Sequence, residues 1–200
     1  MREIEIIIAS SNKNKIREYN ELFKEYPIII SSLEDENIEL DVEETGTTFE
    51  ENALIKARYI SQKINKIVIA DDSGLCIHAL NDFPGIYSSR FMEGQSYILK
   101  NQAINEKMKD FDDKTAHFTC SIVFVSPKDN IEKVFVGRCY GKIVEAINGP
   151  HGFGYDPIFM PDNYSVPFSL LPDEEKNKIS HRGLASKKLI KFLEEYLKNK

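Results

Sequence analysis

A short apolar run that ends in two adjacent carboxylates constrains this chain more than any other feature. The run is Ile67-Val68-Ile69-Ala70, and Asp71-Asp72-Ser73-Gly74 follow directly. Its β-branched character predicts a buried strand whose C-terminal end carries a site, with Ser73 and Gly74 turning the backbone there. Paired acids in that place can hold a hard cation through oxygen, or one can act as a base beside a metal. The same residues are also typical of a plain acidic turn, so other parts of the chain must decide.

Length and charge narrow the classes of protein to consider. A chain of 200 residues can bury a real core, and we expect a single domain over residues 1–200 with room for two lobes and a cleft. The net charge is −6, from 26 basic and 32 acidic residues. This balance argues against a nucleic-acid partner, because a duplex-binding surface needs a strongly basic face. A small anionic ligand remains compatible with it, since a local basic cluster with a metal can outweigh the overall sign.

Cysteine usage and hydropathy indicate the compartment. The three cysteines are far apart and lack paired metal spacing, which indicates free thiols rather than disulfides or a zinc site. No apolar stretch approaches membrane-spanning length, and Met1–Ile8 has the pattern of a first strand, not of a signal peptide. We therefore expect a cytoplasmic protein without a membrane partner.

The N-terminal segment predicts a strand, a polar cap and a helix. Ile4–Ala9 is the strand, and the cap at Ser10-Ser11-Asn12 precedes a helical apolar stripe that includes Tyr19 and Phe23. A helix N-terminus after a strand is a natural phosphate site, and Lys13 and Lys15 add positive charge there. The alternative is an ordinary N-cap with solvated lysines.

The next segment predicts a strand, a connection and a second helix. Ile28–Ser32 is the strand, and Glu34–Asp41 is expected to be an exposed acidic connection. Thr48 and Glu51 have capping-box spacing, so a helix should begin there and run to about Lys63. Glu43 and Glu44 precede that helix, and they are either solvated or share a metal site with the Asp71-Asp72 pair.

The remainder of the chain predicts further strands, turns and three helical segments. Clean alternation over Ala116–Val125 predicts a half-buried strand on whose polar face His117 is a solvated residue, not a ligand. The other expected elements are strands at 75–80, 131–140, 141–147 and 158–160, and helices at 96–108, 173–176 and from Ser180 onward.

Two late segments indicate ligand contact. The loop at residues 148–157 has three glycines and two prolines, and its Phe153 and Tyr155 either stack on a planar base or fill the core. His181 and Arg182 follow the cap Ser180 at a helix N-terminus, where basic side chains oppose the helix dipole. Sequences break a local rule of this kind most often at functional sites.

Six motifs in order resemble the inosine triphosphate pyrophosphatase family, hydrolases of non-standard purine nucleoside triphosphates. The resemblance covers nearly the whole chain. The motifs are Ser10-Ser11-Asn12-Lys13-Asn14-Lys15, Glu43-Glu44-Thr45-Gly46, Ala70-Asp71-Asp72-Ser73-Gly74, Pro84-Gly85-Ile86-Tyr87-Ser88, Gly152-Phe153-Gly154-Tyr155-Asp156-Pro157 and Ser180-His181-Arg182-Gly183. His151 and Leu170-Leu171-Pro172 depart from the usual pattern, which leaves the shape of those loops open.

The resemblance implies an α/β fold with a long mixed sheet flanked by helices, in two lobes around a central substrate cleft, usually as a homodimer. It implies Mg²⁺-dependent hydrolysis of ITP, dITP and XTP to the monophosphate and pyrophosphate. It also implies roles for particular residues. Asp72 is the base and a metal ligand with Glu43 or Glu44, while substrate contacts come from Ser10, Ser11, Asn12, Lys13, Asn14, Lys15, Ser73, Phe153, Gly154, Tyr155, Asp156, Lys176, His181 and Arg182.

The residue inventory suits this chemistry independently of the resemblance. Attack of water on a triphosphate needs a metal, a carboxylate that orients the water, and cations on the leaving pyrophosphate, for which we expect Lys15 and Lys176 on exposed segments. Three alternatives stay open: a pyrophosphatase for modified pyrimidines, a nucleotide sensor without turnover, and a structural domain whose acids only cap turns.

Overall fold

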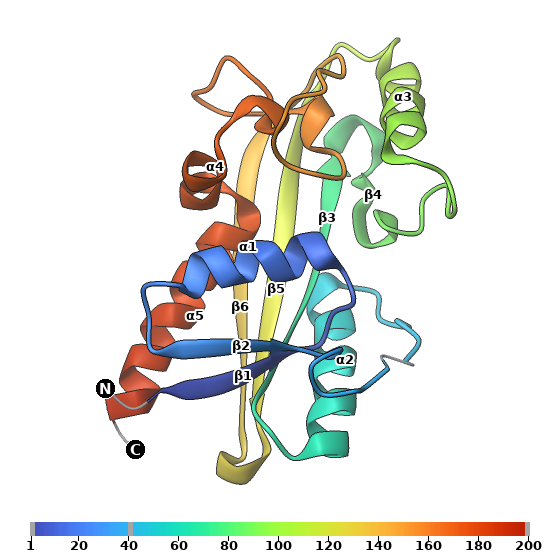
Figure 1. The fold of residues 1–200 in the computed structure, drawn as a ribbon. Coiled ribbons are helices and arrows are strands. Elements are labelled where there is room, and N and C mark those ends of the chain that lie inside the picture. The colour runs from blue at the N-terminus through green and yellow to red at the C-terminus, as the bar shows by residue number, and fades with distance from the viewer. Residues whose placement is uncertain (1–2, 40–41, 199–200) are drawn as a thin grey trace. The chain divides into compact units, whose positions relative to one another are not determined.

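A computed structural model gives the fold of residues 3–39 and 42–198, which is drawn in Figure 1. Within these ranges the chain forms an α/β fold with a mixed seven-stranded sheet, as predicted. No helix there combines the length and the apolar character needed to cross a membrane. The connection expected at Glu34–Asp41 lies partly outside the described residues, at 40–41.

The sheet has the strand order β2-β1-β3-β5-β6-β7, with β4 paired to β3. Its strands are β1 (Ile4–Ile8), β2 (Ile28–Ser32), β3 (Val68–Ile77), β4 (Phe83–Pro84), β5 (Thr115–Ser126), β6 (Ile131–Ile143) and β7 (Phe159–Pro161). The helices are α1 (Lys13–Phe23), α2 (Phe49–Ile64), α3 (Tyr97–Met108), α4 (Asp173–Ile179) and α5 (His181–Lys198).

The chain divides into two compact units, each described here by itself. Unit 1 comprises residues 1–72, 120–137 and 185–200, and unit 2 comprises residues 73–119 and 138–184. The expectation of a single domain over residues 1–200 stays a prediction.

Unit 1 buries both faces of its part of the sheet. Alternate residues of β1 enter different clusters: Ile6 and Ile8 pack with α1 and α5, whereas Ile7 and Ala9 pack with α2. Figure 1 shows α2 on the face of these strands opposite to α1 and α5. Burial on both faces explains why β1 reads as a continuous apolar run rather than as an alternating one.

The helix caps of unit 1 follow the sequence. Asn12 accepts from the backbone N–H groups of Asn14 and Lys15, which fixes the start of α1. Thr48 Oγ1 accepts from the Glu51 N–H at 3.1 Å and starts α2, as predicted. The Glu51 carboxylate turns back one residue further than in a standard capping box, to the N–H and hydroxyl of Thr47.

Two expectations for the central strands are wrong. The carboxylates at Asp71 and Asp72 do not end a strand, because β3 continues through them and through Ser73-Gly74 to Ile77. Strand β5 is not half-buried either: Ser121 is fully buried, since neighbouring residues of β5 enter both apolar clusters of unit 1. In both places packing on two faces holds polar side chains in a regular strand, which alternation alone does not reveal.

Unit 2 has its own apolar cluster, which includes Leu75, Ile104, Phe118 and Phe159. Strand β6 continues through Gly141 to Ile143, whereas the sequence predicts a break there. The glycine serves strand pairing instead of a turn, because a Cβ at Gly141 would collide with the Met160 carbonyl of the paired strand β7.

All three cysteines are free, as predicted from their spacing, and all three are buried. Burial raises the pKa of the Cys76 and Cys139 thiols to about 12. Both thiols are therefore protonated at neutral pH and unreactive toward electrophiles.

Candidate functional site

The predicted carboxylates lie beyond the end of a parallel strand. Strand β1 pairs with β3 at Ile7–Val68 and Ile8–Ile69 and then ends, while β3 runs on. Asp71 and Asp72 therefore sit at the carboxyl edge of β1, where α/β sheets commonly bind their ligands. The location is the one expected, although the strand does not stop there.

Alternation along β3 separates the two acids. Asp71 follows Ile69 on the face covered by α1, and its Oδ2 accepts an ion pair from Lys15 Nζ at 3.0 Å. The side chain of Asp71 has no exposed area, and Cys120 Sγ contacts the same oxygen at 3.7 Å. Lys15, expected on a phosphate, thus pairs with a buried carboxylate in this structure.

Asp72 follows Ala70 on the face covered by α2, where Asn52 Nδ2 donates to Asp72 Oδ2 at 3.1 Å. Burial raises the pKa of the Asp72 carboxyl, and the positive charges of Lys56 and Lys15 only partly oppose this rise. Asp72 is therefore a better proton acceptor than an exposed carboxylate, which suits a general base.

Lys56 organises the group around Asp72. Its Nζ pairs with Glu44 Oε1 at 2.6 Å and donates to the Asp71 carbonyl at 2.8 Å. Burial acts to lower the pKa of Lys56, but the charges of Asp72 and Glu44 outweigh it and raise the pKa. Of the two acids before α2, Glu44 belongs to this cluster, whereas Glu43 is exposed.

The cluster is rich in carboxylates. Three carboxylates, of Glu44, Asp71 and Asp72, meet two ammonium groups, of Lys15 and Lys56. All of the acidic donors are hard oxygens. Such a group can accept a divalent cation.

Asn52 and Lys56 were missed by the sequence reasoning, which placed only apolar residues on the buried face of α2. Both side chains are buried, with Asn52 fully so. They are four residues apart and therefore share one side of the helix. Asn52 Oδ1 also accepts from the Gly46 N–H at 2.8 Å, so it joins the Glu43-Glu44-Thr45-Gly46 segment to Asp72. The sequence signal that could have revealed them is a pair of polar residues, four positions apart, beside the apolar stripe of α2.

The predicted phosphate loop lies at the start of α1. Ser11, Asn12, Lys13 and Asn14 are exposed, and Ser10 is half-buried. Ser10 Oγ and Asn12 Oδ1 accept from three N–H groups, those of Asn12, Asn14 and Lys15. A phosphate would therefore meet hydroxyls and Lys13 before it met these amides. A pocket of about 520 Å³ within unit 1 is lined by Ser10, Ser11 and Lys13.

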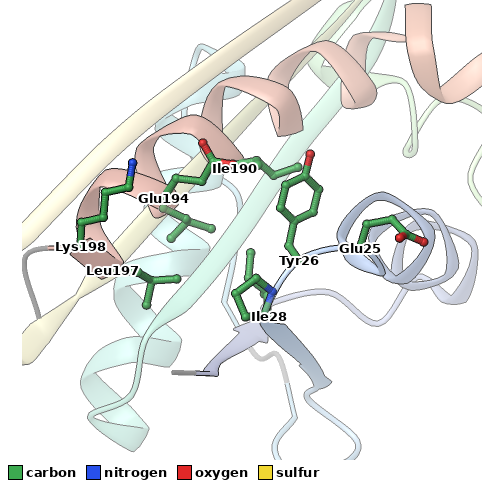
Figure 2. A pocket seen from close by; sticks show the side chains of 9 residues that line it. Glu25, Tyr26, Ile28, Ile190, Glu194, Leu197 and Lys198 are labelled. Atoms are coloured by element: carbon green, nitrogen blue, oxygen red, sulfur yellow. The ribbon is translucent and has the colours of Figure 1, made fainter. Parts of the chain in front are cut away.

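A second pocket in unit 1, of about 640 Å³, lies elsewhere (Figure 2). Its described lining comes from residues 25–28 and from the C-terminal half of α5, including Tyr26 and Leu197. None of these described lining residues is a predicted site residue.

In unit 2 the glycine-rich loop is tied to α4. Lys176 Nζ pairs with Asp156 Oδ2 at 2.8 Å, and the same oxygen accepts from the Phe153 N–H at 2.6 Å. The ammonium group also lies 4.9 Å from the centre of the Phe153 ring. Gly152, at φ +75°, leaves space for the Asp156 carboxylate that a Cβ would occupy. Lys176 is only 3% exposed, so the expectation that it lies on an exposed segment is wrong: the ion pair draws it inward.

Only one of the two loop aromatics is accessible. Phe153 is half-buried and can present a face to a ligand. Tyr155 is buried, donates from its hydroxyl to the Ser88 carbonyl at 2.7 Å and meets Tyr97 edge-on. Gly154 accepts from Asn101 Nδ2 at 3.1 Å. Tyr155 therefore fills the core and does not stack on a base.

The basic residues at the start of α5 are buried. Ser180 caps this helix, as predicted, because its Oγ accepts from the Gly183 N–H at 3.1 Å. Arg182 Nη2 donates to Ser73 Oγ at 2.9 Å, and the His181 ring stacks on Phe118 with centroids 4.6 Å apart. Two predicted substrate residues from distant segments, Ser73 and Arg182, are thus in direct contact.

Known proteins resemble this chain in sequence and in structure. The model of the Ham1 family matches residues 6–192. A dITP/XTP pyrophosphatase of Bacillus cereus is 43% identical over 198 residues, covering 96% of each chain. Two solved structures are similar: the Staphylococcus aureus Ham1 protein has a TM-score of 0.85 and 40% identity over 96% of this chain and 99% of its own. A Ham1 protein of Coxiella burnetii has a TM-score of 0.87 and 37% identity over the same shares.

An α/β fold with acids at the carboxyl edge of a parallel strand defines a class of ligand-binding enzymes. Within that class, this chain belongs to the Ham1 family.

Proposed function

We propose that the protein is a pyrophosphatase that hydrolyses noncanonical purine nucleoside triphosphates, namely dITP, ITP and XTP. Relatives with 42–43% identity over nearly the whole chain carry the name dITP/XTP pyrophosphatase. The observation that carries the proposal is the group formed by buried Asp72 and Lys56 with half-buried Glu44 at the carboxyl edge of β1. A nucleotide sensor or a structural domain has no use for a carboxylate of raised pKa in that place.

In the proposed reaction, water adds to the α-phosphorus and the bond to the β-phosphate bridging oxygen breaks. The products are the nucleoside monophosphate and pyrophosphate. Asp72 accepts the proton of the attacking water, and Asn52 holds the carboxylate in orientation through Asp72 Oδ2. Phosphate oxygens bind to Lys13 and to the hydroxyls of Ser10 and Ser11, which line the pocket of about 520 Å³ at the start of α1.

The donor set also suits a divalent metal. Mg²⁺ prefers one or two carboxylates together with water and substrate phosphates. Asp72 and Glu44 offer two hard oxygen ligands beside Lys56. When bound, Mg²⁺ would neutralise charge on the triphosphate. We assign the metal to these two residues, with Glu43 and Asp71 outside the ligand set.

Base recognition is assigned to unit 2. Hypoxanthine and xanthine present O6, a hydrogen-bond acceptor, where adenine presents an amino group. The guanidinium of Arg182, held by Ser73, can donate a hydrogen bond to O6. With adenine, the guanidinium would instead face the amino group, so that two donors meet and neither is satisfied. Phe153 supplies a stacking face, and Lys176 and Asp156 fix the loop that carries it.

Three further parts of the proposal rest on the family resemblance and on the overall charge. These are homodimer formation, a cytoplasmic location, and the absence of nucleic-acid and membrane partners. The net charge of −6 is compatible with them.

The proposal is tested by measuring pyrophosphate release from ITP, XTP, dITP, ATP and GTP, each with and without Mg²⁺. We expect release from the first three only, and only with the metal. Orthophosphate as the product, equal rates on ATP, or full activity in a metal chelator would each contradict it. The same assay on modified pyrimidine triphosphates distinguishes this activity from that of a pyrimidine-directed pyrophosphatase.

A further inference from the structure

A second group of ligating side chains lies in unit 2, outside the residues assigned above. His78 begins the short 3₁₀ turn at His78–Leu80, Asp82 lies in the turn before β4, and His117 lies on β5. One donor atom from each lies within 4.8 Å of the others. His78 Nε2 and His117 Nδ1 are 3.0 Å apart. The expectation of His117 as a solvated residue is therefore wrong, because a partner 39 positions away in the sequence meets it.

A chain of hydrogen bonds fixes the orientation of His78. Its Nδ1 lies 2.9 Å from Thr115 Oγ1, and that hydroxyl donates to Asp113 Oδ1 at 2.6 Å. Since the Thr115 hydrogen goes to the carboxylate, the hydroxyl accepts from His78 Nδ1–H. His78 Nε2 then accepts from His117 Nδ1–H, and an ion that takes the place of this hydrogen requires the His117 ring to carry its proton on Nε2 instead. His78 thus has the arrangement of a metal-binding histidine whose other nitrogen is held by an outer partner.

His117 lies among charged and aromatic side chains. Burial lowers the pKa of His117; Asp82 opposes the effect, while His78 and Arg138 add to it. The ring also lies against Tyr140, with centroids 5.5 Å apart.

We propose that His78, Asp82 and His117 form a binding site for Zn²⁺ or a similar late first-row divalent ion. Two imidazole nitrogens and one carboxylate oxygen suit these ions and do not suit Mg²⁺. Bond lengths of about 2.0–2.1 Å in tetrahedral geometry place two ligand nitrogens about 3.3 Å apart, so the pair at 3.0 Å has to open only slightly. Asp82 is exposed and free to close on the ion, and water completes the shell.

The bound ion would join the turn at residues 78–82 to strand β5. Because the unfolded chain does not hold these ligands together, zinc would stabilise unit 2 against unfolding. The inference does not depend on the proposed function, since none of the three residues belongs to that machinery.

The test is zinc titration of the full chain, followed by long-range ¹H–¹⁵N spectra of the imidazole nitrogens, in excess Mg²⁺ to suppress zinc binding by Asp72 and Glu44. The chain has four histidines. We expect His78 Nε2 and His117 Nδ1 to shift and saturate at one equivalent, while His151 and His181 stay unchanged. Unshifted signals of His78 and His117, or equal shifts at all four residues, would overturn the proposal.

Variants sharpen the result by calorimetry in the same buffer. Loss of an outer-shell partner costs about 10–100-fold in metal affinity, so Thr115→Val should weaken zinc binding by about 10-fold. His117→Gln removes a ligand and should lower zinc affinity by more than 100-fold. If His117→Gln does not fold, Asp82→Asn serves in its place, because Asp82 lies on an exposed turn. The matched control is His151→Gln, with wild-type affinity expected. The proposal would be overturned if Asp82→Asn bound zinc with wild-type affinity and a second variant, either folded His117→Gln or Thr115→Val, did so as well.

Discussion

At the scale of single residues, Asp72 combines two properties that a water-activating base needs. Its pKa is raised by burial, and its orientation is set by a hydrogen bond from Asn52. We expect Asp72→Asn to lower kcat by about 10²–10⁴-fold while the protein remains folded, because the amide cannot accept the proton. Pyrophosphate release and circular dichroism measure the two effects, with exposed Asp112→Asn as the control. Substantial turnover in folded Asp72→Asn would remove this residue as the base.

Lys56 makes a structural contribution that is separate from turnover. Its ammonium group is buried beside Glu44 and Asp72, and removing it takes away a positive charge that stabilises both carboxylates. Loss of one partner from a buried pair costs about 3–5 kcal/mol, so Lys56→Met should lower the free energy of unfolding by that amount. Urea denaturation measures it, with exposed Lys63→Met on the same helix as the control. Equal unfolding free energies in the two variants would mean that the ion pairs of Lys56 do not stabilise the fold.

Arg182 is expected to set base selectivity. Hydrogen-bond readout can reject the wrong group by about 10⁴-fold and shape alone by about 10²-fold, so Arg182→Ala should reduce the ITP-to-ATP preference by about 100-fold, together with the rate on ITP. The measurement is kcat/KM for both nucleotides. Because Arg182 is only 2% exposed, Arg182→Lys serves as a less disruptive variant, and exposed Lys187→Ala is the control. An unchanged ratio in both Arg182 variants would place recognition on other residues.

At the scale of elements, the junction between α4 and α5 depends on close backbone approach. A Cβ at Gly183 would collide with the Asn177 carbonyl, while Ser180 caps the helix three residues earlier. We expect Gly183→Ala to cost about 1–3 kcal/mol, as overpacked sites do. Urea denaturation against exposed Lys191→Ala tests this. A neutral result would show that the α4–α5 junction can relax without loss.

Local patterns predicted most elements, because caps and periodicity act over a few residues. Strands β1 and β2 and helices α1, α2 and α3 lie where the sequence places them, and Asn12, Thr48 and Ser180 cap as expected. The predictions failed where distant segments decide. Packing on both faces carries β3 through Asp71-Asp72, and an ion pair with Asp156 buries Lys176.

The candidate site shows the same division between local and distant causes. Asp72 and Arg182 were predicted, the first from its strand and the second because a basic residue at a helix N-terminus opposes the helix dipole. Asn52 and Lys56 were not, since nothing within α2 shows that Asp72 and Glu44 lie beside it. The contact between His78 and His117 was equally hidden, because each lies on a separate element of unit 2.

At the scale of the whole molecule, substrate binding should be visible as stability. A ligand that binds only the folded chain, at 100 times its Kd, adds about 2.7 kcal/mol, which corresponds to roughly 5–10 °C in Tm for a chain of this size. We expect a non-hydrolysable ITP analogue with Mg²⁺ to raise Tm by this amount. The matched ATP analogue at equal concentration is the control. Equal rises with both analogues would contradict base selectivity at the binding step.

The buried thiols have a consequence for when such a protein can work. Hypoxanthine and xanthine nucleotides arise when nitrosating chemistry deaminates adenine and guanine, and the same reagents attack cysteine thiolates. Cys76 and Cys139 stay protonated, because burial raises their pKa to about 12, and Cys120 is fully buried. A pyrophosphatase built this way offers those reagents little to modify. It would keep its activity under the conditions of chemical stress that create its substrates.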